Sequence, residues 1–287
     1  MSDQSLINIG ELAKPATALI EKISSAVGVM FEPVQIVRVA RAEAEAELIR
    51  AEAQIQVSDL QRRAAYRFIE EEGKKQLNME GITQRALPLL EEKSDPGKVA
   101  TDWITNFFDK SRIVSNNDMQ ALWSRVLAGE ANAPGTFSRK TVNLLGDLDK
   151  SDAQLFTMLC GFGWAIGQAT QIVPLIFDVT AKIYNENGVS FNTLSHLESL
   201  GLIQFNNVAH FQFMGLPQSL HVSYFGTNIE LTLPGEAHNA LPTGTVMLTR
   251  AGLELARICG SKPVGGFLDF VYDEWARSSF VPKHRTK

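Results

Sequence analysis

The feature that most constrains the fold is a stretch from Val34 to Met79 that contains no proline and a single glycine, Gly73. Its most repetitive part reads AEAEAELIRAEAQ and places alanine at nearly every second position. Alanine and glutamate are strong helix formers and are depleted in β-strands. The sequence therefore predicts one long Ala/Glu-rich helix over residues 34–79, and a helix of about 45 residues is near 65 Å long.

A weak apolar stripe runs along this predicted helix in steps of three and four residues and, after a step of five, continues through Leu60, Ala64 and Phe68. A helix whose side chains are mainly methyl groups and carboxylates gains little stability from packing within one chain. Such a helix is therefore expected to pack closely against a partner. The alternative is a solvated helix that only separates two domains. We predict that this surface brings copies of the chain together through Ala40, Ala44, Leu48, Ala51 and Ile55.

The second half of the same predicted helix carries most of its cations, and they support a different function. A nucleic-acid-binding regulator would use them for phosphate contacts. The whole chain has 27 basic and 32 acidic residues and a net charge of -5, so it has no bulk attraction for nucleic acid. Nucleic acid is thus a partner that the sequence permits but does not favour, through Arg62, Arg63, Arg67, Lys74 and Lys75.

The remaining pattern predicts a mostly α-helical chain with a smaller α+β part. Residues 1–33 form an amphipathic N-terminal lead, and residues 80–150 form a helical domain with aromatic and leucine faces. Residues 151–287 contain helices, alternating strands and a returning helix, which is the order of a winged-helix-like domain. Asn116 or Asn117, Ser190 and Thr249 are candidate helix N-caps, and Gly201 is a candidate left-handed helix stop.

The charge of the predicted winged-helix-like domain argues against the usual DNA-binding role of such a domain. No lysine or arginine occurs between Lys182 and Arg250. Because phosphate contacts supply much of the affinity for DNA, we expect this domain to contact protein or only to provide a core. Four histidines lie in this span: His196, His210, His221 and His238. Their spacing matches no zinc motif, so we interpret them as surface or hydrogen-bonded histidines rather than as metal ligands.

One loop between predicted helices is rich in polar residues and suggests a third function. The segment LAGEANAPGTFSRKT contains Glu130, Asn132, Ser138 and Arg139, which could form a small polar site of an enzyme. The alternative is a capped inter-helix loop in which Glu130 pairs with Arg139, since loops and caps use the same residue types. Phosphate-binding glycine loops and the GxSxG and HExxH motifs do not occur in the sequence, and we predict no cofactor and no metal.

The cysteines and one uncharged, apolar stretch bear on where in the cell the protein is located. Cys160 and Cys259 each lie in an apolar context, which predicts reduced, buried thiols of a cytoplasmic protein rather than a disulfide. The stretch Leu155 to Phe177 has the length of a membrane span. Its glutamines, threonines, proline and glycines favour a buried helix, a turn and a buried strand, so we do not expect it to cross a membrane.

Several segments together resemble a known family. They are the leader KPATALIEKISSAVGVMFEPVQIVRVARAEAEAELIRAEA, the middle block DWITNFFDKSRIVSNNDMQALWSRVLAGEANAPGTFSRKT, and the later TLSHLESLGLI and VMLTRAGLELARICG. The chain resembles the bacterial family called domain of unknown function 2806 over nearly its whole length. The leader alone is similar to the front end of other bacterial proteins, some linked to phage defence. The resemblance implies a mobile-element or defence context and supplies no catalytic residues.

These observations lead to one main expectation about function. We expect a cytoplasmic, non-enzymatic interaction protein that self-associates through its long helix. Its C-terminal domain binds a further protein or senses a signal. A nucleic-acid-binding regulator is the second hypothesis, and an enzyme with a polar site near Glu130 and Arg139 is the third.

Overall fold

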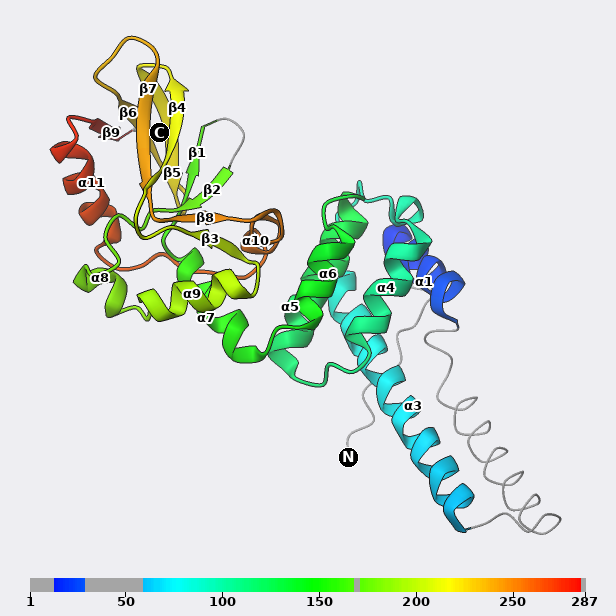
Figure 1. Ribbon diagram of the computed structural model, residues 1–287. Helices are drawn as coiled ribbons and strands as arrows, with labels where there is room; N and C mark the ends of the chain where they lie inside the picture. Colours follow the sequence, from blue (N-terminus) through cyan, green and yellow to red (C-terminus); the bar gives the residue numbers. More distant parts are fainter. Residues whose placement is uncertain (1–12, 29–58, 168–170, 285–287) are drawn as a thin grey trace. The chain divides into compact units, whose positions relative to one another are not determined.

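The computed structural model describes residues 13–28, 59–167 and 171–284. It divides the chain into two units, Met1–Gly146 and Asp147–Lys287, each with its own set of internal contacts. The described part of the first unit is helical, and the second combines helices with small antiparallel sheets (Figure 1). The prediction of a mostly helical chain with a smaller α+β part is confirmed at this level.

The first unit is a bundle in which α3 packs on α5, and α4 packs on α1 and α6. Its helices are α1 (Lys14–Val27), α3 (Asp59–Ala86), α4 (Thr101–Ser111), α5 (Asn117–Asn132) and α6 (Arg139–Gly146), with single 3-10 turns at Leu87–Leu89 and Pro96–Lys98. Helix α5 begins at the predicted cap, because the Asn116 side chain accepts hydrogen bonds from the backbone N–H groups of Asp118 and Met119. Helix α1 contacts α4, so the described part of the amphipathic lead, residues 13–28, packs against the bundle.

Aromatic rings form the centre of this bundle. Phe107 lies 5.1 Å from Trp103 in a stacked arrangement and 5.1 Å from Trp123 in an edge arrangement, measured between ring centroids. Leu19 and Ile23 of α1 are fully buried, as the helical spacing of the N-terminal lead predicts. The aromatic residues of the predicted helical domain 80–150 therefore form its core.

A buried polar network joins α3 to α5. The Gln120 side chain donates from Nε2 to Asn78 Oδ1 (3.1 Å) and to the backbone oxygen of Val114 (2.7 Å). Arg85 donates to the other end of the same amide, and Asn78 Nδ2 donates to the backbone oxygen of Arg112 at 2.9 Å. Since a buried amide must find partners for all its polar atoms, this network fixes how the C-terminal half of α3 lies on α5.

Helix α3 overlaps the second half of the predicted long helix and extends past its C-terminal end. Its described part begins at Asp59, and residues 34–58 of the predicted helix lie outside the described residues. At the other end α3 continues beyond Met79 to Ala86, because Ile82 and Ala86 are fully buried. The helix ends where a 3-10 turn containing Pro88 begins.

The second unit surrounds its core with helices and three antiparallel sheets. The helices are α7 (Lys150–Cys160), α8 (Lys182–Asn185), α9 (Phe191–Ser199), α10 (Arg250–Ala256) and α11 (Phe267–Arg277). The five-stranded sheet has the order β2-β1-β5-β6-β9, and two pairs, β3–β8 and β4–β7, complete the strands. The strands are β1 (Gly163–Ile166), β2 (Gln171–Pro174), β3 (Ile203–Phe205), β4 (Phe211–Leu216), β5 (Ser219–Tyr224), β6 (Thr227–Thr232), β7 (Asn239–Gly244), β8 (Val246–Leu248) and β9 (Val281–His284).

The order α8, α9, β3, β8, α10 resembles the predicted winged-helix order, with a large difference between β3 and β8. These two strands pair through Ile203 with Leu248 and Phe205 with Val246. Between them lie four further strands, of which β5 and β6 join the five-stranded sheet. A simple wing would be one hairpin, so the winged-helix-like assignment stays a prediction.

An aromatic cluster fills the core of the second unit. Trp164 of β1 stacks on Tyr224 of β5, with 5.0 Å between the ring centroids. From α11, Trp275 contacts Trp164 edge-on and Phe267 contacts Tyr224 edge-on. The Tyr184 hydroxyl donates to the backbone oxygen of Leu175 (2.8 Å), which ties α8 to the segment after β2. Helix α11 thus contributes to the core of this unit through Phe267 and Trp275.

The uncharged stretch from Leu155 to Phe177 is divided between the end of α7, β1 and β2. Trp164, Val173 and Ile176 within it are buried. Among the described residues, we find no helix with both the length and the apolar character that a membrane crossing needs.

Candidate functional site

The most unusual surface of the described residues is the first two thirds of α3. From Asp59 to Asn78 every side chain is exposed or half-buried, and burial begins at Met79. In Figure 1 this part of α3 extends past the ends of α4 and α5 within its own unit. A helix of this length without a core contact is marginal in water, because most helix stability in proteins comes from packing.

Four large apolar side chains are exposed on this part of α3: Leu60 (69 %), Tyr66 (47 %), Phe68 (63 %) and Leu77 (70 %). At about 100° per residue, Leu60 and Phe68 lie on one side of the helix, with Ala64 between them. We call Leu60, Ala64 and Phe68 the α3 stripe. Tyr66 and Leu77 lie on the opposite side. Their spacing of eleven residues is close to three helical turns, so these two residues share a face of the helix.

The α3 stripe continues the apolar stripe predicted from the sequence. The five residues to which self-association was assigned, Ala40, Ala44, Leu48, Ala51 and Ile55, lie outside the described residues. Their assignment stays a prediction. What the described residues add is that the next members of the stripe are exposed rather than covered by the bundle.

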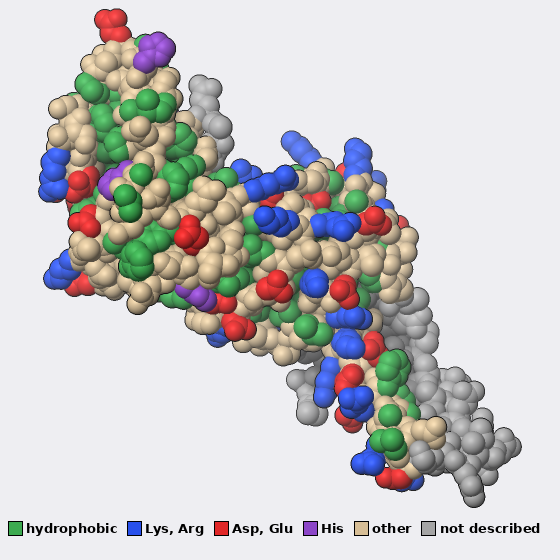
Figure 2. Space-filling model, viewed as in Figure 1, with side chains coloured by type: hydrophobic (Ala, Val, Ile, Leu, Met, Phe, Trp, Pro, Cys, Tyr) green, Lys and Arg blue, Asp and Glu red, His purple; other side chains and the backbone are tan. Residues whose placement is uncertain are grey.

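The cations of the nucleic-acid hypothesis lie on the same part of α3, interleaved with acids (Figure 2). Asp59 to Leu77 holds five cations and four carboxylates, so its net charge is close to zero. Four of the five cations contact carboxylates of the same helix. The fifth cation, Lys74, is exposed. The pairs are Arg62–Asp59 (2.5 Å), Arg63–Asp59 (3.1 Å), Arg67–Glu71 (3.7 Å) and Lys75–Glu72 (2.6 Å).

Glu130 of the predicted polar loop is buried and holds the loop after α5. Its Oε1 accepts a hydrogen bond from the backbone N–H of Gly135 (2.7 Å), and its Oε2 accepts one from the backbone N–H of Phe137 (2.8 Å). The backbone oxygen of Phe137 in turn accepts from Trp103 Nε1 (2.7 Å). Both carboxylate oxygens therefore bind main-chain donors, as in a structural loop anchor.

The other three residues of the polar loop lie in different surroundings. Asn132 spans two backbone groups, donating to the oxygen of Leu89 (3.0 Å) and accepting from the N–H of Glu91 (2.9 Å). Ser138 accepts from the backbone N–H of Thr141 (3.2 Å) in the first turn of α6, and Arg139 is exposed. These contacts are those of an inter-helix loop.

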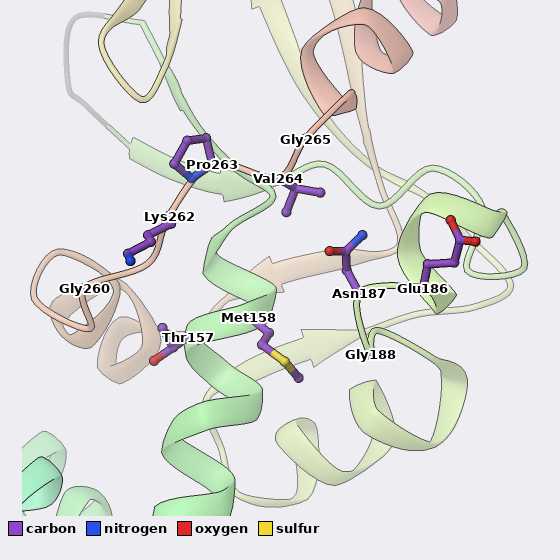
Figure 3. Close-up of a pocket in the computed structure, with 10 residues that line it drawn as sticks. All are labelled: Thr157, Met158, Glu186, Asn187, Gly188, Gly260, Lys262, Pro263, Val264 and Gly265. Carbon is purple, nitrogen blue, oxygen red and sulfur yellow. The ribbon is translucent and has the colours of Figure 1, made fainter.

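A cavity of about 630 Å³ lies in the second unit between the C-terminal half of α7, residues 186–188 and residues 260–265 (Figure 3). Three of its ten lining residues are glycines. Met158, Val264 and Asn187 face its interior, whereas the amino group of Lys262 points away from Asn187 and Glu186. Because its polar groups do not converge on one point, this cavity resembles an open groove more than a catalytic site.

The histidines of the cation-free span lie apart from one another. His196 of α9 contacts Asp152 of α7, with Nε2 and Oδ1 2.8 Å apart. His221 lies on β5 opposite Glu230 of β6, and His238 precedes β7 with a φ of 58°. The part of the chain that the structure describes contains no group of three or more His, Cys, Asp or Glu side chains placed to hold a metal ion.

The sequence from residue 62 to 271 matches the model of the family described as protein of unknown function (DUF2806). The chain belongs to this family. Comparison with the curated proteins and with the solved structures finds no match. The family region begins within the exposed part of α3 and ends within α11, so the family includes most of the α3 surface, both units and the polar loop.

Proposed function

We propose that this protein is a non-enzymatic interaction protein that self-associates through α3, with the α3 stripe of one copy packed on that of another. The observation that carries the proposal is the exposure of Leu60 and Phe68 on a helix segment without a buried side chain before Met79. Contiguous apolar side chains on a solvated helix are the usual sign of a helix-to-helix contact. A phage-defence or mobile-element context, and a further protein partner for the C-terminal unit, belong to the same proposal.

A second copy suits the charges of this surface better than nucleic acid does. The segment Asp59–Leu77 is nearly neutral and carries both signs along its length, so two copies do not repel each other. A phosphate backbone would meet carboxylates beside almost every cation. We therefore place the nucleic-acid regulator second, and the enzyme third because both oxygens of Glu130 bind main-chain N–H groups.

The energy of such a contact can be estimated from exposure. Fully burying a leucine or phenylalanine contributes about 1.5–3 kcal/mol, so covering the exposed two thirds of Leu60 or Phe68 contributes about 1–2 kcal/mol each. Two copies contribute four such side chains, or about 4–8 kcal/mol. Losing them weakens association by roughly a thousandfold or more, since 1.4 kcal/mol is a factor of ten.

The test is the molar mass of the full-length protein by light scattering over a range of concentrations. We expect the wild type to exceed the monomer mass of 31.6 kDa and the double variant Leu60→Glu, Phe68→Glu to be monomeric with unchanged helix content. Ile113→Glu is the matched control, because Ile113 is 69 % exposed and lies off α3 in the same unit. A monomeric wild type, or equal loss of mass in the control, would overturn the proposal.

A further inference from the structure

The outer face of the five-stranded sheet carries small side chains in register. Ala165 of β1 pairs with Ile172 of β2 on one side and with Ser223 of β5 on the other. Directly paired residues of neighbouring strands point to the same face of a sheet. These three residues are half-buried, whereas their neighbours Trp164 and Val222 are buried and point into the core. Alanine and serine leave space above the sheet at this row.

A second cavity, of about 340 Å³, lies over this row. Its lining includes Ala165, Ile172 and Ser223, and residues 256–257 and 260–261 form another part of it. Helix α10 contacts β2, which places the chain that leaves α10 beside the sheet. The volume is at the lower end of the range of small-molecule sites, about 300–1,000 Å³.

The lining of this cavity contains one cation, Arg257, and its guanidinium is free to bind a ligand. Arg257 directly follows α10 and is exposed. Among the described residues, none forms a hydrogen bond or an ion pair with this side chain, and the described lining holds no Asp, Glu or Lys. The hydroxyls of Ser223 and Ser261 belong to the same lining. One guanidinium without an acid beside it suits a ligand with a single negative charge, and a carboxylate matches its geometry.

Phe225 lines the same cavity from the tip of the β5–β6 hairpin. The two-residue turn of this hairpin consists of Phe225 and Gly226, with φ values of 44° and 88°. Positive φ at both positions favours Asn-Gly or Gly-Gly, and a bulky aromatic residue is an outlier at the first of them. The Phe225 side chain contacts Tyr224 edge-on but is still 43 % exposed. A half-exposed ring held in a strained backbone conformation beside a cavity is typical of a ligand contact.

We propose that this cavity binds a small aromatic carboxylate. The ring of the ligand lies against the Phe225 ring and over the small side chains of Ala165 and Ser223, and its carboxylate accepts hydrogen bonds from the Arg257 guanidinium. A phosphate ester carries more negative charge and is usually bound by several cations or by a helix N-terminus, so a single guanidinium favours the carboxylate. This site is separate from the self-association proposed for α3, and it gives the second unit a ligand of its own.

The first test is isothermal titration calorimetry on the full-length protein with benzoate, 1-naphthoate and indole-3-acetate as probes. We expect at least one of these acids to bind saturably, with one molecule per chain. For that acid, the uncharged alcohol with the same ring should bind about tenfold more weakly, because it lacks the charge-assisted hydrogen bond. Saturable binding of none of the three acids, equal affinity for the alcohol, or tighter binding of adenosine monophosphate than of all three acids would each overturn the proposal.

Arg257→Gln tests the anion contact. The variant should bind the acid about tenfold more weakly and bind the alcohol as the wild type does, with an unchanged urea midpoint, because Arg257 is exposed. Arg277→Gln is the matched control, since Arg277 is an exposed arginine of the same unit that does not line the cavity. Equal effects of the two substitutions on the affinity for the acid would contradict the role of Arg257.

Phe225→Asn separates a ligand contact from a structural role. Asparagine is favoured at this position of the turn, so the variant should be at least as stable as the wild type in urea titrations. Its affinity for the acid should nevertheless fall about fivefold, because the ring contact is lost. Unchanged affinity together with lower stability would show that Phe225 serves only the hairpin, and would overturn the proposal.

Discussion

Removing the Glu130 carboxylate should loosen the loop after α5, because we interpret Glu130 as a structural anchor of this loop and not as a catalytic residue. Glu130→Ala leaves the N–H groups of Gly135 and Phe137 without their acceptors. A hydrogen bond to a charged group contributes about 1.5–3 kcal/mol. Phe137 is buried, so its N–H loses the full amount, whereas the exposed Gly135 can bind water instead. We expect a local loss of about 2–4 kcal/mol.

Amide hydrogen exchange measures this loss at the two donors themselves. A loss of about 2–4 kcal/mol corresponds to exchange of the Phe137 amide that is roughly 30- to 700-fold faster. Glu130→Gln should lie between the wild type and Glu130→Ala, because its amide offers one acceptor and places an NH₂ group against the other donor. Arg139→Ala, at an exposed position, should change stability by less than about 0.5 kcal/mol.

The refuting result is an unchanged Phe137 amide in Glu130→Ala. That outcome would show that the carboxylate does not hold the loop. If the variant also lost a biological phenotype while remaining folded, the enzymatic hypothesis would regain support.

The remaining predictions concern three glycines and a tyrosine. Gly252→Ala would place a Cβ 2.0 Å from the backbone oxygen of Leu202. This variant should lower the free energy of unfolding, measured by urea titration, by about 3 kcal/mol or more. Gly265→Ala is the control and should leave the free energy of unfolding unchanged, because its Cβ would meet no atom within 4 Å. Gly73→Ala, in open space on α3, should raise helix stability by about 0.5–1 kcal/mol, measured by circular dichroism on heating. Burial raises the pKa of Tyr184, so stability should fall as pH rises above 10.0 and fall less in Tyr184→Phe, measured as the unfolding midpoint against pH.

The sign of the tyrosine prediction follows from proton binding. In the unfolded chain the phenol ionises near 10.0, and in the folded chain it ionises at a higher pH. Above 10.0 the unfolded state therefore loses its proton first and is favoured. Stability that increased with pH in this range, or an identical slope in Tyr184→Phe, would contradict the burial of this hydroxyl.

Short-range features of the sequence were sufficient to place several element boundaries. Asn116, Ser190 and Thr249 cap helices as predicted, each accepting a hydrogen bond from a backbone N–H two or three residues later. Gly201 has a φ of 79°, which matches the predicted left-handed stop after α9. These features depend on neighbours within one helical turn, which is why a single sequence reveals them.

The sequence by itself determined that α3 is a helix whose apolar residues cannot all face one core, because composition and spacing act locally. Only the tertiary structure decided which groups meet across long separations. Glu130 binds the main-chain donors of Gly135 and Phe137, β1 pairs with β5 through Ala165 and Ser223, and Tyr224 of β5 donates to the backbone oxygen of Gly161. Such partners are selected by how whole elements pack, and local propensity carries no information about distant partners.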